Sequence, residues 1–188
     1  MAPVSPEPRR LNAKKSFAIA CALFPGEEWV FKEPGIWVAR SRLQEEYKEP
    51  DKWEREMSQT RILTSRGSAA YFLPEINKGG EAAKLCADLV LDGVVMEMKT
   101  VTGSRVTLGT EFRFAYKQGA ALLTSYPGIE GHSVFIRLKS DLSVGSVRAK
   151  IAGELKNRTD TGTFVCYFEK TGQLYAWGYD ELKAIIGT

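Results

Sequence analysis

Hydrophobic residues recur along the chain in short runs separated by turn residues, a pattern typical of alternating helices and strands. Residues 51–66 have apolar positions at helical spacing, and Gly67 is placed to end that helix. A second amphipathic helix is predicted over residues 110–125. Apolar runs predict strands over residues 69–73, 88–91, 94–101 and 132–138. The order helix, three strands, helix, strand predicts an α/β core in which helices flank a mixed central sheet.

The region that follows this core also has patterns that predict secondary structure. Residues 141–158 look helical, and residues 163–177 read as a hairpin around Lys170-Thr171-Gly172, followed by a closing helix over residues 179–186. The core is therefore expected to carry an extra C-terminal hairpin and helix.

The N-terminal fifty residues are expected to form a separate appendage. Residues 1–15 contain three prolines and two basic pairs, which predict a flexible cationic arm. The apolar stretch 17–24 is expected to pack on the domain, with a secretory signal as the alternative. Residues 29–31 and 36–38 flank a Pro-Gly turn and predict a short hairpin. The expected division is a basic arm and hairpin over residues 1–50, packed on a main domain over residues 51–188.

Composition narrows the class of protein. The 188 residues are 44% hydrophobic and 26% charged, and no apolar run approaches the roughly 18 residues that span a bilayer, so the sequence predicts a folded domain without a membrane span. The formal net charge of +3 permits a polyanionic partner without requiring one.

Histidine and cysteine usage excludes several chemistries. The single histidine, His132, rules out histidine-pair ribonuclease and His-Glu-x-x-His metalloprotease chemistry, and we expect it to have a capping or surface role. Cys21, Cys86 and Cys166 stand far apart, so neither a zinc site nor a disulfide framework is indicated. The common glycine-rich nucleotide-binding loops are absent from the sequence.

The segment with the clearest chemistry is the predicted hairpin around Asp92-Gly93, a dipeptide typical of two-residue turns. Pairing outward from that turn places Asp88 directly opposite Glu97, and Lys99 lies diagonally beside them on the same face. The other face of the hairpin is wholly apolar.

Two opposed carboxylates repel each other and need compensation. Lys99 can supply part of it, and a hard divalent cation such as Mg²⁺ or Mn²⁺ can supply the rest. The alternative interpretation is an ordinary solvated strand face with incidental ion pairs.

The residues around this hairpin resemble the PD-(D/E)XK nuclease superfamily over about residues 54–138. The resemblance is closest to the nuclease domains at the C-terminal ends of CdiA-type contact-dependent inhibition toxins and to their phage-borne relatives. It rests on three segments: Glu56-x-x-x-Thr60-x-x-Leu63-x-x-x-Gly67, Ala87-Asp88-Leu-Val-Leu-Asp-Gly93, and Glu97-Met98-Lys99-Thr100. Ala87 stands where the motif has proline, and Thr60 where a small alanine is usual.

The resemblance implies roles for these residues by position. Asp88, Glu97 and Lys99 match the catalytic motif, Glu56 matches the helix carboxylate, and Gln118 matches a polar residue of the following helix. Asp88, Glu97 and Glu56 would then bind Mg²⁺ or Mn²⁺ during phosphodiester hydrolysis. Metal-free cleavage of RNA through its 2′-hydroxyl stays open, with a carboxylate or a lysine as the base.

Basic residues outside the hairpin are candidates for binding a nucleic-acid backbone. Residues 137–158 hold six cations against two carboxylates, and the alternative is a solvated helix face. The candidate contacts are Lys84, Arg105, Arg148, Lys150 and Lys156.

The function expected from these features is a toxin-like endonuclease that cleaves RNA, with tRNA favoured by the resemblance alone. A divalent-metal DNase using the same residues is the first alternative, and a catalytically silent nucleic-acid-binding or phage structural module is the second. The resemblance further implies a cognate immunity protein, and action in the cytoplasm of a cell to which the domain is delivered, by secretion or as part of a larger toxin.

Overall fold

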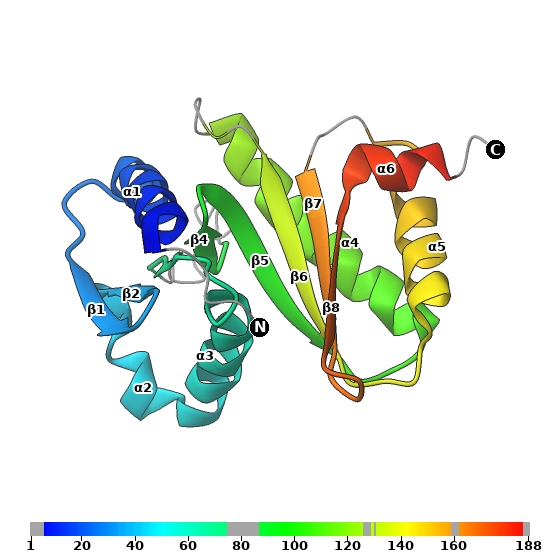
Figure 1. Cartoon of the computed structure of the whole chain (residues 1–188), viewed down its shortest axis with the longest axis horizontal. Helices are drawn as coiled ribbons and strands as arrows, with labels where there is room; N and C mark the ends of the chain where they lie inside the picture. The colour runs from blue at the N-terminus through cyan, green and yellow to red at the C-terminus, as the bar shows by residue number, and fades with distance from the viewer. Residues whose placement is uncertain (1–5, 75–86, 126–128, 130, 159–161, 186–188) are drawn as a thin grey trace. The chain divides into compact units, whose positions relative to one another are not determined.

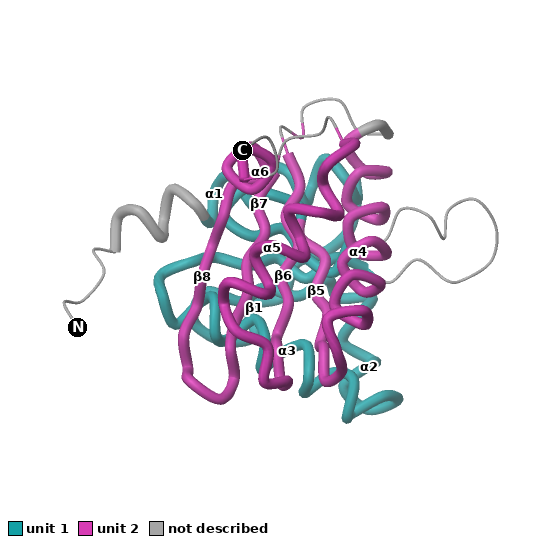
Figure 2. Tube along the Cα trace, turned by 90° about the vertical axis from the view of Figure 1, so that its right-hand side faces the viewer, with its two compact units in different colours: residues 1–95 teal, residues 96–188 magenta. Residues whose placement is uncertain are grey.

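A computed structural model describes residues 6–74, 87–125, 129, 131–158 and 162–185. The chain divides into two compact units, residues 1–95 (unit 1) and residues 96–188 (unit 2), which Figure 2 colours separately. The described residues contain eight β-strands and six α-helices, and both parallel and antiparallel strand pairs occur. The predicted mixed α/β class is therefore confirmed.

Unit 1 contains four strands, with a mixed pairing pattern. Strands pair in chain order, antiparallel from β1 to β2, parallel from β2 to β3 and antiparallel from β3 to β4. Its elements, most of them labelled in Figure 1, are α1 (Pro6–Leu23), β1 (Trp29–Glu33), β2 (Ile36–Ala39), the 3₁₀ helix η1 (Arg40–Arg42), α2 (Glu45–Lys48), α3 (Pro50–Thr64), β3 (Ala70–Phe72) and β4 (Leu89–Leu91).

The two faces of the unit 1 sheet pack against different helices. On one face Trp37 and Tyr71 stack with their ring centroids 4.9 Å apart, and Phe17 of α1 contacts Tyr71 at 5.7 Å. On the other face Phe72 meets Trp53 of α3 at 6.3 Å. The apolar alternation of β2 and β3 thus fixes both helices, because residues on successive positions face opposite sides.

Helix α1 is tied to the turn that follows β4. The Ser16 hydroxyl donates to the carbonyl of Ala69 at 3.3 Å and accepts from the Gly93 amide at 2.9 Å. Ser16 is fully buried. A single side chain from the N-terminal helix therefore bridges the start of β3 and the Asp92-Gly93 turn.

Unit 2 pairs its strands in the order β5-β6-β7-β8, with β6 and β7 parallel and β7 and β8 antiparallel. A single apolar core contains side chains from these strands and from three helices. A Ser143 side chain caps the second of these helices by accepting from the Ser146 amide at 3.2 Å. The elements are β5 (Val94–Val101), which contains the boundary with unit 1, α4 (Arg105–Ser125), β6 (His132–Leu138), α5 (Val144–Leu155), β7 (Gly162–Phe168), β8 (Gln173–Gly178) and α6 (Tyr179–Ala184).

The structure differs from the sequence-based expectation at several points. Residues 6–15 belong to α1, whereas a flexible arm was expected, and α4 begins at Arg105, five residues before the predicted start. The boundary between the units falls after Val95, whereas the sequence suggested a division at residue 50. His132 is fully buried against the rings of Tyr116 and Tyr179, so the prediction of a surface role is wrong.

Candidate functional site

The Asp92-Gly93 turn is confirmed in its backbone conformation. Both residues have positive φ angles, 51° and 86°, as a type I′ turn requires. The Asp92 carboxylate also accepts from the Ala69 amide at 2.8 Å, which holds the turn against β3. A turn of this kind fixes the register of the strands on either side. The pairing of Asp88 with Glu97 across the hairpin stays a prediction that follows from this turn.

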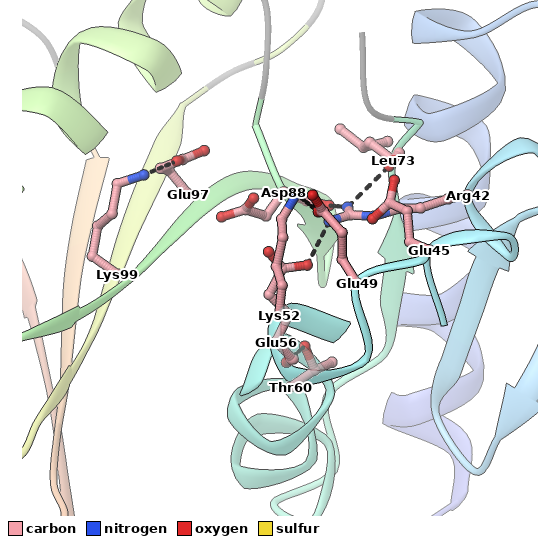
Figure 3. A network of polar contacts seen from close by, with 10 residues as sticks. All are labelled: Arg42, Glu45, Glu49, Lys52, Glu56, Thr60, Leu73, Asp88, Glu97 and Lys99. Atoms are coloured by element: carbon pink, nitrogen blue, oxygen red, sulfur yellow. Dashed lines mark hydrogen bonds and ion pairs between the residues drawn. The ribbon is translucent and has the colours of Figure 1, made fainter. Parts of the chain in front are cut away.

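In unit 1 a buried arginine organises the polar groups around Asp88 (Figure 3). The Arg42 guanidinium donates through Nη2 to Glu56 Oε2 at 2.5 Å and through Nε to Glu45 Oε2 at 3.1 Å. Its Nη1 donates to the main-chain oxygens of Leu73 and Asp88, both at 3.1 Å. Arg42 thus links η1 to α2, to α3, to the residue that follows β3 and to the residue that precedes β4.

The Glu56 carboxyl is a weaker acid than an ordinary glutamate side chain. Burial raises the pKa of Glu56 from 4.5 to about 7, the Arg42 guanidinium opposes this shift, and the Asp88 carboxylate adds to it. Asp88 therefore lies close enough to Glu56 in unit 1 for its carboxylate to raise the pKa of Glu56, and both residues were named from the sequence. A carboxyl that titrates near neutral pH is suited to proton transfer.

This pKa predicts a specific dependence of stability on pH. Because the pKa of Glu56 in the folded protein lies above its ordinary value, the folded protein keeps this proton where the unfolded chain has lost it. The resulting stabilisation is full below about pH 4.5 and is lost as the pH rises through about 7, a fall of about 3 kcal/mol in the free energy of unfolding. Urea unfolding at several pH values should show this fall in the wild type and not in Glu56→Gln. Parallel profiles for the two proteins would mean that Arg42 keeps Glu56 ionised throughout.

In unit 2 Glu97 and Lys99 form an ion pair on β5, with Lys99 Nζ 2.5 Å from Glu97 Oε1. Glu97 is only 2% exposed, and Lys99 is half-buried. The alternative of an ordinary solvated face is therefore wrong for Glu97. Met96 and Met98, on the opposite face of the strand, are also buried, so the predicted apolar face is confirmed there.

The carboxylates do not gather into a three-ligand metal group. Among the described residues, no set of three or more His, Cys, Asp and Glu side chains is arranged to hold a metal ion. Glu56 gives one oxygen to Arg42. The ion site expected of Asp88, Glu97 and Glu56 stays a prediction, which a cleavage assay with added metal can test.

The remaining candidates lie in different places. Gln118 is half-buried on α4 and Arg105 is exposed at the start of that helix, both in unit 2 with Glu97 and Lys99. Lys84 lies outside the described residues.

The basic stretch 137–158 is less positive than its sequence suggests, because carboxylates distant in the chain pair with it. Arg137 pairs with Glu169, and Arg148 pairs with Glu181 at 2.7 Å. Lys150 pairs with Glu154 within the stretch at 2.7 Å. Lys139 and Lys156 are exposed. The case for a phosphate-binding surface therefore rests most on these two lysines.

Sequence reasoning missed Arg42, which has the most hydrogen-bonding contacts of the residues in this cluster. It stands in a segment with several other charged residues, and no motif distinguishes it from them. The one signal that pointed to such a residue was the buried face of α3, because a buried carboxylate such as that of Glu56 needs a cationic partner.

Comparison of the chain with protein-family models, curated proteins and solved structures gives no match. No helix in the described part of the chain is long and apolar enough to cross a bilayer.

Proposed function

We propose that the chain is an endonuclease that cleaves phosphodiester bonds in RNA. The observation that carries the proposal is the Glu97–Lys99 pair, a buried carboxylate and a half-buried ammonium placed two residues apart on the strand that leaves the Asp92-Gly93 turn. Burying a charged pair is costly and is common at functional sites. That Asp88 lies opposite this pair stays a prediction from the Asp92-Gly93 dipeptide, and tRNA is the substrate that the resemblance favours.

Each polar group has a chemical role in this proposal. The Lys99 ammonium offsets the negative charge that develops on the phosphorus oxygens as the bond to the leaving group breaks. Asp88 and Glu97 are the candidates for accepting a proton from the attacking hydroxyl, because the chain's only histidine is buried among aromatic rings. Glu56, with a pKa of about 7, is suited to exchange a proton at neutral pH.

The test is incubation of the purified protein with total tRNA, ribosomal RNA and plasmid DNA, each with Mg²⁺, with Mn²⁺ or with EDTA, followed by mapping of the new ends. Cleavage of tRNA supports the proposal, and activity in EDTA would show the metal-free route. Cleavage of plasmid alone would favour the DNase alternative. Binding without any cleavage would favour the silent binding module and overturn the proposal.

The resemblance extends the proposal to a toxin-like role. In that role the domain acts in the cytoplasm of a target cell and is neutralised by a cognate immunity protein. Induced expression should then arrest growth, and Lys99→Ala should relieve the arrest. Growth unaffected by the active protein would count against the toxin role while leaving the nuclease proposal to the assay in solution.

The pairing of the basic residues predicts unequal effects of charge reversal. Lys156→Glu should raise KM for the cleaved RNA severalfold with little change in kcat, because an exposed lysine contributes to binding the backbone. Arg148→Glu should raise KM less, since Glu181 already offsets the Arg148 charge. Steady-state rates at low and moderate salt measure both effects. An unchanged KM in Lys156→Glu would make this stretch an ordinary solvated surface.

A further inference from the structure

Arg42 is as deeply buried as Glu97, with 2% of its surface exposed. It lies at the end of η1, and its guanidinium sits over the ring of Phe72, with Cζ 5.1 Å from the ring centroid. Each of its three nitrogens already donates to a side-chain or main-chain oxygen of unit 1. Its influence on any reaction must pass through the groups that it binds.

Those groups are the ones that carry the candidate chemistry of unit 1. Through Nη2 the guanidinium fixes the Glu56 carboxylate on α3, and through Nη1 it binds the main-chain oxygen of Asp88 just before β4 (Figure 3). The same Asp88 oxygen accepts from the Leu73 amide at 3.0 Å. The end of β3, the start of β4 and helix α3 are thus joined at one side chain.

The planar fork of an arginine is needed for this arrangement. Its donors point in fixed directions and reach a carboxylate and two carbonyl oxygens at once, whereas the ammonium of a lysine is a compact point charge. The Nε contact with Glu45 further restricts rotation of the guanidinium.

We propose that Arg42 is a positioning residue, which sets the Asp88 main chain and the Glu56 carboxylate at a fixed separation for the cleavage reaction. This inference rests on the proposed function for its catalytic part. Its physical part, the restraint on Asp88, stands on the hydrogen bonds alone.

The first test compares Arg42→Lys with Arg61→Lys, using total tRNA as the probe. Arg61 is a matched control, because it is an exposed arginine that pairs with two glutamates and touches none of the site residues above. Measured well below the thermal transition, Arg42→Lys should lower kcat by about tenfold or more with KM nearly unchanged. Arg61→Lys should cleave like the wild type.

The second readout is amide hydrogen exchange, which a uniformly weakened fold would change everywhere. In Arg42→Lys the Leu73 amide, which donates to the Asp88 oxygen, should exchange about tenfold faster. The Ala70 amide, at the start of the strand that precedes Leu73, donates to the Gly35 carbonyl and serves as the internal reference, and its exchange should stay unchanged.

If Arg42→Lys does not fold, two milder variants on α2 provide the test. Glu45 and Glu46 are neighbours on α2 and both are ion-paired, Glu45 with Arg42 and Glu46 with Lys32. Glu45→Gln should lower kcat by about threefold and speed Leu73 exchange, because the guanidinium can then turn, and Glu46→Gln should do neither.

The outcomes separate the two proposals. No cleavage by the wild type rejects the nuclease function, while Leu73 exchange still tests the restraint on Asp88. An active wild type with unchanged kcat or unchanged Leu73 exchange in Arg42→Lys overturns the positioning role. If that variant is unfolded, identical behaviour of Glu45→Gln and Glu46→Gln overturns it.

Discussion

Alanine at Lys99 is expected to lower kcat for RNA cleavage by about a hundredfold or more, the largest effect on activity that the site predicts. The Lys99 ammonium lies 2.5 Å from Glu97 Oε1 on β5, so its loss removes the group that would offset charge on the phosphorus oxygens and breaks this ion pair with a buried carboxylate. Cleavage of end-labelled tRNA at saturating substrate measures the change.

Asp88→Ala and Glu97→Ala should reduce activity by similar factors, because residues that act as one unit give large, non-additive losses. Lys170→Ala is the matched control, since Lys170 is an exposed lysine paired with Asp141 on a hairpin turn. Circular dichroism should show all four variants folded. Full activity in any one of the three site variants would place the reacting groups elsewhere.

The largest effect on stability is expected for Arg42→Met. This change leaves the Glu56 carboxylate and the main-chain oxygens of Leu73 and Asp88 buried without the guanidinium, which should cost about 3 to 5 kcal/mol in the free energy of unfolding. Urea denaturation at pH 8, where Glu56 is largely ionised, gives the clearest measurement.

The double variant Arg42→Met with Glu56→Leu is the informative control. Removing both charges eliminates the unpaired carboxylate, so the double variant should be more stable than Arg42→Met alone. The opposite order of stability would show that the guanidinium stabilises the protein chiefly through its carbonyl contacts and through its position over Phe72.

Local patterns in the sequence were sufficient to predict most of the helices and strands. The Asp92-Gly93 pair predicted a turn, and both residues adopt the positive φ that such a turn needs. The hairpin of residues 29–39 and the strand His132–Leu138 were also readable, because alternation and turn residues act over a few positions. Helix, three strands, helix, strand is the observed order from α3 to β6.

Features that depend on residues far apart in the chain could not be predicted from the sequence. The basic stretch loses much of its excess charge to Glu169 and Glu181, which are 32 or 33 residues further along the chain. His132 looked like a surface residue because its aromatic neighbours come from α4 and α6. The burial of Glu97, and that of Glu56 beside Arg42, likewise depends on tertiary packing, which the local spacing of residues does not determine.

The hydroxyl of Ser16 has a consequence for the order in which unit 1 folds. A two-residue hairpin turn closes in microseconds from local contacts, but the Gly93 amide finds its Ser16 partner only across 77 residues of chain. The turn can therefore form first and helix α1 can dock onto it afterwards, once β3 is in place. During synthesis the ribosome releases α1 long before its docking site exists, so the N-terminal helix must wait for the centre of the chain to emerge.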